Sequence, residues 1–197
     1  MRDPKDYQFD LLASHRPTEP PLNEKVHPVA WAAARHCTSA RTGDPNKAIR
    51  AIVIHATAGA STSGAVSVMQ EHRASFHWLI PDENEAAHGK FVWASAPESR
   101  AAWHVRNNCS HKNVFMGATR INDWSLGIEI VNTQQQGDKF SDWQIQACAE
   151  IIRYAWVKYP NLTHIVSHAR LDPMRRTDPG ANFPWEALEH QTLARTE

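Results

Sequence analysis

The sequence predicts an α/β fold in which a single mixed β-sheet is flanked by helices. Short apolar runs of strand length recur from residue 51 onward, and turn-forming residues separate them. Two longer segments with helical spacing of apolar residues lie among these runs, which favours one sheet with helices on its faces. The apolar runs are residues 51–55, 75–80, 91–94, 124–131 and 163–167.

Residues 1–48 predict an irregular, Pro-rich N-terminal arm that packs on the rest of the domain. They hold six of the 12 prolines and few runs that look like strands. One short helix is expected at residues 29–34, and Val26 and Trp31 favour a packed arm over the alternative of a loose tail. Residues 49–197 then form the main folded unit.

The sequences of the predicted strands indicate how each strand is buried or paired. Ala51–His55 is apolar up to its histidine, as expected of a strand buried on both faces. Residues 75–80 and 91–94 flank the turn cluster Pro81-Asp82-Glu83-Asn84 and should pair as a hairpin. The two later runs complete the sheet.

The helices are predicted from spacing and from the residues that begin them. Residues 62–73 place apolar side chains on one face. Residues 141–159 do the same, and they open with Ser141 and Gln144, a capping-box pair that can satisfy each other's free amides. A short final helix is expected at residues 184–190.

Composition and charge exclude several classes of protein. Hydrophobic residues make up 42% and charged residues 21% of the chain, which indicates a globular protein. The formal net charge is zero, so nothing favours nucleic acid or an anionic membrane as a partner. No apolar run approaches the roughly 20 residues that cross a bilayer, and the first residues lack a secretory pattern. We therefore expect a protein that is cytoplasmic as synthesised, without membrane insertion, and that acts outside the cell only if released or exported by another route.

The three cysteines are an odd number without CxxC spacing, which argues against a disulfide framework or a thiolate zinc site. Cys148 lies on the apolar stripe of the second helix and is expected in the core. The sequence leaves a single bridge between Cys37 and Cys109 open.

Polar side chains end or interrupt three of the apolar runs. His55 ends the first, Glu129 interrupts the fourth, and His168 follows the fifth, with Asp178 ten positions later. Two imidazoles and a carboxylate suit a zinc site with an open fourth position, and a nearby non-ligating glutamate suits a proton acceptor. Each residue alone has an ordinary alternative: packing histidines, a turn aspartate before Pro179-Gly180, and a glutamate that points to solvent.

Five segments carry a more specific signal than any single residue. They are Ile52-Val53-Ile54-His55, Phe76-His77-Trp78-Leu79-Ile80, Ala102-Trp103-His104, Ser125-Leu126-Gly127-Ile128-Glu129 and His168–Gly180. Together they resemble the AmpD-like zinc amidases. These are N-acetylmuramoyl-L-alanine amidases that share a fold with amidase-type phage lysozymes and animal peptidoglycan recognition proteins. The resemblance extends over roughly residues 49–186, and its last segment is the most specific.

The resemblance implies an N-acetylmuramoyl-L-alanine amidase-like fold, with residues 49–197 as the zinc amidase catalytic domain. It implies His55, His168 and Asp178 as ligands of one Zn²⁺, and Glu129 as the catalytic carboxylate. Arg176 stands where the family usually has a lysine. We expect this guanidinium to stabilise the oxyanion, and a surface salt bridge is the alternative.

Other residues are expected to contact substrate. Trp103 and His104 are candidates for the substrate groove, because aromatic faces suit stacking on sugar rings. The long polar loop at residues 106–123 is expected to shape this groove around a peptide stem. His77, which lies on a predicted strand, is expected to be structural.

The implied reaction is hydrolysis of the amide bond between the lactyl group of N-acetylmuramic acid and L-alanine of the stem peptide. The substrate is peptidoglycan or a soluble muropeptide, which suits either a recycling enzyme or an endolysin. The alternatives are a non-catalytic peptidoglycan-binding module and a zinc peptidase that acts on cell-wall peptides. We expect a monomer, because no long apolar stripe is left over after the core is assigned.

Overall fold

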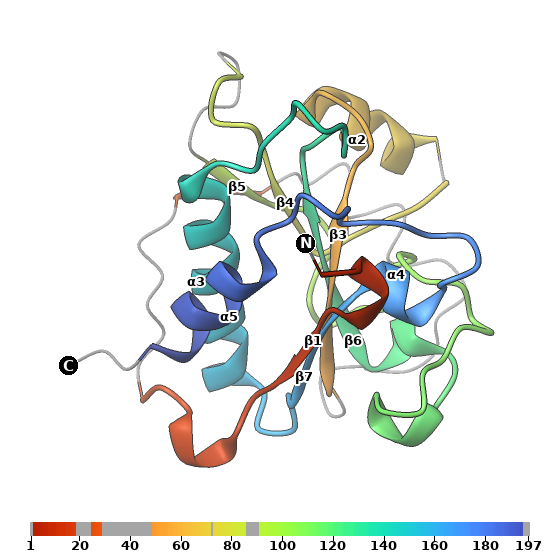
Figure 1. The fold of residues 1–197 in the computed structure, drawn as a ribbon, viewed down its shortest axis with the longest axis vertical. Coiled ribbons are helices and arrows are strands. Elements are labelled where there is room, and N and C mark those ends of the chain that lie inside the picture. Colours follow the sequence, from red (N-terminus) through yellow and green to blue (C-terminus); the bar gives the residue numbers. More distant parts are fainter. Residues whose placement is uncertain (1, 19–24, 29–48, 72, 86–90, 195–197) are drawn as a thin grey trace.

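The computed structural model describes residues 2–18, 25–28, 49–71, 73–85 and 91–194 of the 197-residue chain. Within these residues, seven strands form one mixed sheet in the order β1-β7-β3-β6-β4-β5-β2 (Figure 1). The α/β class and the single mixed sheet predicted from the sequence are therefore confirmed. The strands are β1 (Gln8–Asp10), β2 (Lys25–Pro28), β3 (Ala51–Ala56), β4 (Trp78–Ile80), β5 (Phe91–Ala94), β6 (Ser125–Ile130) and β7 (His164–Ser167).

The centre of the sheet consists of parallel strands. β3 pairs in parallel with β6 on one side and with β7 on the other, and β4 pairs in parallel with β6. The carboxyl ends of these strands meet at one edge of the sheet, where α/β proteins often bind ligands. β4 and β5 pair antiparallel, as the predicted hairpin requires. Every residue of β3 is buried, as expected for a strand covered on both faces.

Two helices, α3 (Asp142–Lys158) and α5 (Trp185–Leu193), lie side by side along one face of the sheet (Figure 1). α3 begins with the predicted capping box. The Ser141 hydroxyl accepts the N–H of Gln144 at 3.2 Å, and the Ser141 N–H donates to the Gln144 side chain at 3.1 Å. The core between these helices and the sheet includes Ile52, Ile54, Leu126, Ile128, Ile145, Cys148, Ile152 and Trp156.

The opposite face is covered by α4 (His168–Leu171) and by residues 106–123. This segment contains two short 3₁₀ helices, Phe115–Gly117 and Ile121–Asp123, and it is therefore more ordered than its polar sequence predicts. Alternate side chains of β3 point to the two faces. A second apolar cluster lies on this face and includes Ala51, Val53, Val105, Val114, Ile121, Trp124, Val166 and Leu171.

The N-terminal segment supplies both outer strands of the sheet. β1 pairs antiparallel with β7, and β2 pairs in parallel with β5. The expectation of irregular structure is wrong at these two places. Strands of three and four residues are too short to show a pattern, and they form here by pairing with distant residues.

The first strand is anchored by side chains on either side of it. Tyr7 and Phe9 are buried, and Tyr7 stacks on Trp185 of α5 with 4.9 Å between ring centroids. The helix expected at residues 29–34 lies outside the described residues, as does Trp31. The division of the chain at residue 48 stays a prediction.

Two helix boundaries differ from those predicted. The first amphipathic helix, α2, spans Thr62–Gln70 and so ends earlier, whereas α5 extends beyond the predicted end at residue 190. Within the described ranges, no helix is both long enough and apolar enough to cross a membrane. Cys109 and Cys148 are free and buried, Cys148 in the core as predicted, and Cys37 lies outside the described residues.

Candidate metal centre

Three of the predicted site residues lie at the carboxyl ends of the parallel strands. His55 is next to last in β3, and Glu129 of β6 stands beside it in direct register. His168 follows β7 as the first residue of α4, whose N-cap is Ser167. This chain direction brings the His168 ring to 4.5 Å from the His55 ring, centroid to centroid.

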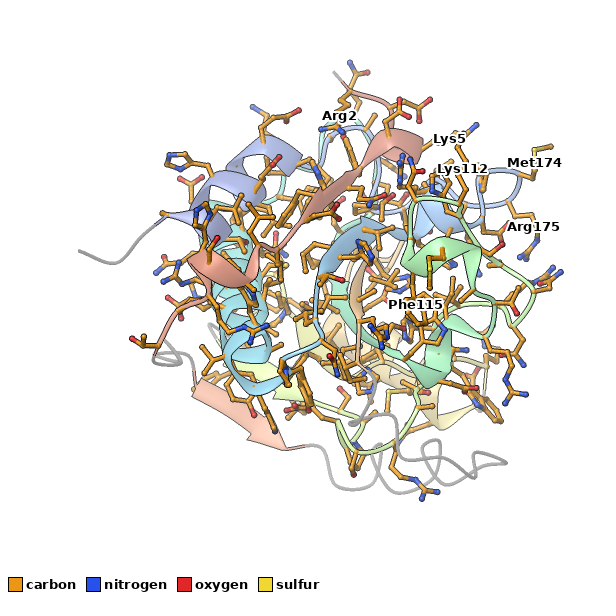
Figure 2. All side chains as sticks on the ribbon, turned by 90° about the horizontal axis from the view of Figure 1, so that it is seen from below. Arg2, Lys5, Lys112, Phe115, Met174 and Arg175 are labelled. Atoms are coloured by element: carbon orange, nitrogen blue, oxygen red, sulfur yellow. The ribbon has the colours of Figure 1, made fainter. Side chains whose placement is uncertain are left out.

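Asp178 reaches the same place through a tightly folded loop. The Asp172 carbonyl accepts the N–H of Arg176 at 2.9 Å, and the Ala169 N–H donates to the Asp178 carbonyl at 3.0 Å. These bonds hold the loop after α4 against the start of that helix. Met174, on the outer side of the loop, is 91% exposed and projects away from the surface (Figure 2).

The side chains of His55, His168 and Asp178 converge on one point. The two Nδ1 atoms lie 3.0 Å apart, and the Asp178 Oδ2 lies 3.1 Å from His55 Nδ1 and 3.0 Å from His168 Nδ1. All three side chains are buried. Among the described residues, this is the group of histidine, cysteine and acidic side chains whose positions suit a metal ion.

The donor set fits zinc in its chemistry and spacing. A tetrahedral zinc ion with bonds of about 2.0–2.1 Å separates its ligand atoms by about 3.3 Å, close to the observed distances. Burial is the main cause that lowers the pKa of His55 to about 4, and the nearby His168 is the second. Burial raises the pKa of Asp178, but the close ring nitrogens of His168 and His55 outweigh it and hold this pKa below its usual value. At neutral pH, His55 is therefore neutral and Asp178 ionised, as metal ligation requires.

Glu129 is a partly buried carboxyl group beside these three residues. Burial raises the pKa of Glu129 well above the usual value, and the negative charge of Asp178 raises it further. The positive charge of Arg176 lowers this pKa, but by less. Its side chain lines the cavity, and no hydrogen bond or ion pair to its carboxylate is found among the described residues. A carboxylate with a raised pKa next to a metal site is suited to accept and return a proton.

Replacing Glu129 with glutamine is expected to raise the melting temperature of the metal-free protein at pH 7. Because the folded state raises the pKa of Glu129, ionisation of this group destabilises the folded state at neutral pH. A gain of 1 kcal/mol would appear as about 2–4 °C in a chain of this size. The gain should disappear as the pH falls below the ordinary carboxyl pKa of 4.5, where both states are protonated. Melting curves from pH 3.5 to 7.5 test this, and a variant that melts lower than the wild type at pH 7 contradicts it.

The four residues open into a cavity of about 640 Å³. Its wall includes Phe76 from the segment before β4, Gln134 from the segment after β6, and Arg176 from the loop before Asp178. The structure thus places Arg176 in the same cavity as Glu129. The Arg176 side chain is exposed, and within the described part of the chain it has no salt-bridge partner.

A second cavity of about 430 Å³ adjoins the first and shares several of its residues. Four arginines and Trp103 line it, and no acidic residue does. Arg73 pairs with Glu71 at 3.1 Å and Arg175 pairs with Asp172 at 2.8 Å, both outside the cavity lining. The remaining two arginines give the cavity a positive character. The four arginines are Arg73, Arg106, Arg175 and Arg176.

The two residues predicted to bind substrate, Trp103 and His104, differ in burial and in their contacts. Trp103 is partly buried and lines the second cavity. His104 also borders both cavities, but it is only 8% exposed, and its Nδ1 lies 3.0 Å from Nε2 of His55. His77 is fully buried: its Nδ1 accepts the N–H of Gly127 at 2.9 Å, and its Nε2 lies 3.0 Å from the Arg100 carbonyl. The prediction that His77 is structural is confirmed.

Gln134 and Arg73 of the cavity walls were not predicted. The Gln134 side-chain amide donates to the Ala56 carbonyl at 3.1 Å and accepts the Thr177 hydroxyl at 3.2 Å, so it joins three parts of the cavity wall. Gly180, at φ +95°, lies against Gln134: a Cβ atom there would lie 3.3 Å from Cβ of Gln134 and would require a small shift of that side chain. The sequence offered no signal for Gln134 or Arg73, because only the tertiary fold brings them to the site, whereas Arg106 begins the loop that was expected to shape the groove.

Comparisons with known proteins agree on one family. The chain is 34% identical over 154 residues to the N-acetylmuramoyl-L-alanine amidase AmiD of Escherichia coli K12, covering 74% of this chain and 54% of the relative. It is 30% identical over 114 residues to the 1,6-anhydro-N-acetylmuramyl-L-alanine amidase AmpD of Citrobacter freundii, covering 57% of this chain and 54% of that relative. The chain thus spans about half the length of these curated relatives.

A solved structure of E. coli AmiD holds the substrate anhydro-N-acetylmuramic acid-L-Ala-D-γ-Glu-L-Lys. It superimposes with a TM-score of 0.60 and 29% identity, over 79% of this chain and 61% of that one. The family model of Amidase_2, described as N-acetylmuramoyl-L-alanine amidase, matches residues 45–181. These residues include the whole cluster formed by His55, Glu129, His168 and Asp178, and the chain belongs to the N-acetylmuramoyl-L-alanine amidase family.

Proposed function

We propose that this protein is a zinc-dependent amidase that cleaves the bond between the lactyl group of N-acetylmuramic acid and L-alanine of the stem peptide. The observation that carries the proposal is the meeting of His55, His168 and Asp178 at one point. Beside them lies the carboxylate of Glu129, which has no hydrogen-bond or ion-pair partner among the residues that the structure describes. A binding module has no need of a proton acceptor at that place. Family membership supports the same reaction.

In this proposal, each residue of the site has a separate role. His55, His168 and Asp178 hold the zinc ion, which when bound acidifies water and polarises a carbonyl oxygen. Glu129 accepts a proton from the attacking water and later delivers it to the leaving nitrogen of alanine. Arg176 faces the same cavity and stabilises the negative charge that develops on the carbonyl oxygen.

The second cavity supports a muramyl peptide as the substrate class. The ligand of the AmiD structure contains a glutamate linked through its γ-carboxyl group, so its α-carboxylate is free. Arginines bind carboxylates through paired N–H groups. We propose that the stem peptide extends from the metal site into the cavity lined by Arg106 and Trp103, where its carboxylates meet positive charge.

The proposed function is tested with purified protein, soluble anhydromuramyl peptides and intact sacculi. We expect about one zinc ion per chain by elemental analysis, release of the intact stem peptide by mass spectrometry, and loss of turnover after chelation. Zinc without hydrolysis of either substrate would favour the binding module, and cuts within the stem would favour a peptidase. Comparing the rates on the two substrates separates a recycling role from lysis of the wall.

Arg176 is expected to act through its positive charge. Arg176→Ala should lower kcat by about 10²–10³-fold, the loss typical when one group that stabilises an oxyanion is removed. Arg176→Lys should retain most of the activity, because an ammonium supplies charge at a similar position. Lys112→Ala, which removes an exposed cation outside both cavities, is the control. Steady-state kinetics test the series, and full activity of Arg176→Ala contradicts the role.

A further inference from the structure

His104 is part of a chain of hydrogen bonds that begins at the candidate ligand His55 and ends on a backbone carbonyl. Nε2 of His55 lies 3.0 Å from Nδ1 of His104, and Nε2 of His104 lies 3.3 Å from the hydroxyl oxygen of Ser125. The Ser125 hydroxyl donates to the Ile121 carbonyl at 2.7 Å. Both rings and Ser125 are buried, so water does not compete for these bonds.

The end of this chain determines the direction of every bond in it. The Ile121 carbonyl can only accept, so Ser125 uses its single hydrogen there. Ser125 must therefore accept from His104, which places the proton of His104 on Nε2. Nδ1 of neutral His104 is then an acceptor, and it accepts the N–H at Nε2 of His55. This leaves Nδ1 of His55 without a hydrogen, and Nδ1 is the atom that faces His168 and Asp178.

The surroundings of His104 hold its ring at this position. Gly127 of β6 lies directly beneath it, since a Cβ atom there would lie 2.8 Å from Cγ of His104. The Asn122 side chain accepts the backbone N–H of His104 at 3.2 Å and that of Val105 at 2.9 Å. Only a residue without a side chain at position 127 lets the imidazole lie against the strand and reach His55.

We propose that His104 is a positioning residue, which fixes the proton of His55 on Nε2 and so presents the lone pair of Nδ1 to the metal ion. Ser125 orients His104 in the same way. This inference rests on the proposed zinc site. It assigns His104 a role through His55, in place of the contact with substrate expected from the sequence. Partners of ligating histidines commonly contribute about 10–100-fold to metal affinity.

Zinc affinity provides the first test, measured by competition with a chromophoric chelator. His104→Phe keeps the volume of the ring but removes the acceptor, and it should weaken zinc binding by about 10–100-fold. His104→Asn should recover much of this loss, because its side-chain oxygen stands near the position of Nδ1. His111→Phe makes the same change at a histidine outside both cavities and should leave the affinity unchanged.

Nuclear magnetic resonance of ¹⁵N-histidine-labelled protein provides the second test, and its first readout uses the wild type alone. The spectra of metal-free protein should show both His55 and His104 with hydrogen on Nε2, and Ser125→Ala should mix the two forms of His104. Hydrogen on Nδ1 of His55, or zinc affinity of His104→Phe equal to that of a zinc-binding wild type, would overturn this inference alone. A wild type that binds no zinc would overturn the proposed function and this inference with it.

Discussion

Replacing Glu129 with glutamine is expected to lower kcat by about 10²–10⁴-fold, the usual contribution of a general base, while zinc content stays at the wild-type level. The carboxylate lines the cavity but is not one of the three converging ligand atoms. Glutamine has nearly the same shape and cannot accept a proton at neutral pH. Turnover of an anhydromuramyl peptide and elemental analysis of the same preparation make the test.

Glu186→Gln is the matched control for this experiment. It makes the same chemical change at an exposed position of α5, outside both cavities, and should leave turnover unchanged. A Glu129→Gln variant with wild-type kcat would exclude Glu129 as the proton acceptor. A variant that lost both turnover and zinc would instead place Glu129 among the ligands.

Replacing Asp178 with asparagine is expected to weaken zinc binding by more than about 100-fold, beyond the loss seen when a partner of a ligand is removed. The change removes the anionic member of the ligand set and keeps its volume. Hydrolysis should fall with zinc occupancy and recover in part at high zinc concentration. Titration of the metal-free protein with zinc, followed by calorimetry, measures the affinity directly.

Asp142→Asn serves as the control for Asp178, because Asp142 is exposed at the start of α3, outside both cavities. It should bind zinc like the wild type. Unchanged zinc affinity in Asp178→Asn would mean that the ion is held elsewhere, and the assignment of all three ligands would fail with it.

Local sequence patterns predicted the elements whose stability is local. The capping box of Ser141 and Gln144 and the helical spacing that follows it lie within one segment, and α3 forms as expected. The continuous apolar run of β3 reflects burial on both faces, which its sequence shows directly. β1 and β2 could not be predicted in this way, because each is short and depends on a partner strand that is far away in the sequence.

For the candidate site, too, the sequence predicted residue identities but not the contacts between residues that are distant in the chain. The resemblance supplied the identities of His55, Glu129, His168 and Asp178, and the fold brings all four to one edge of the sheet. The sequence could not indicate which neighbour each of its histidines contacts. The place of His104 in the substrate groove stays a prediction, and the contact of its Nδ1 with Nε2 of His55 at 3.0 Å is a feature that only the fold reveals.

The outer strand β1 covers an edge of the sheet that lies next to the candidate metal site. β1 and α5 both lie beyond residues 45–181, the part that the family model matches. Trimming the protein to that part would uncover the free edge of β7, immediately before His168, and remove the aromatic stack of Tyr7 on Trp185. Uncovered strand edges favour self-association. The part of the chain that the family model matches is therefore shorter than the polypeptide needed to cover the edge of β7.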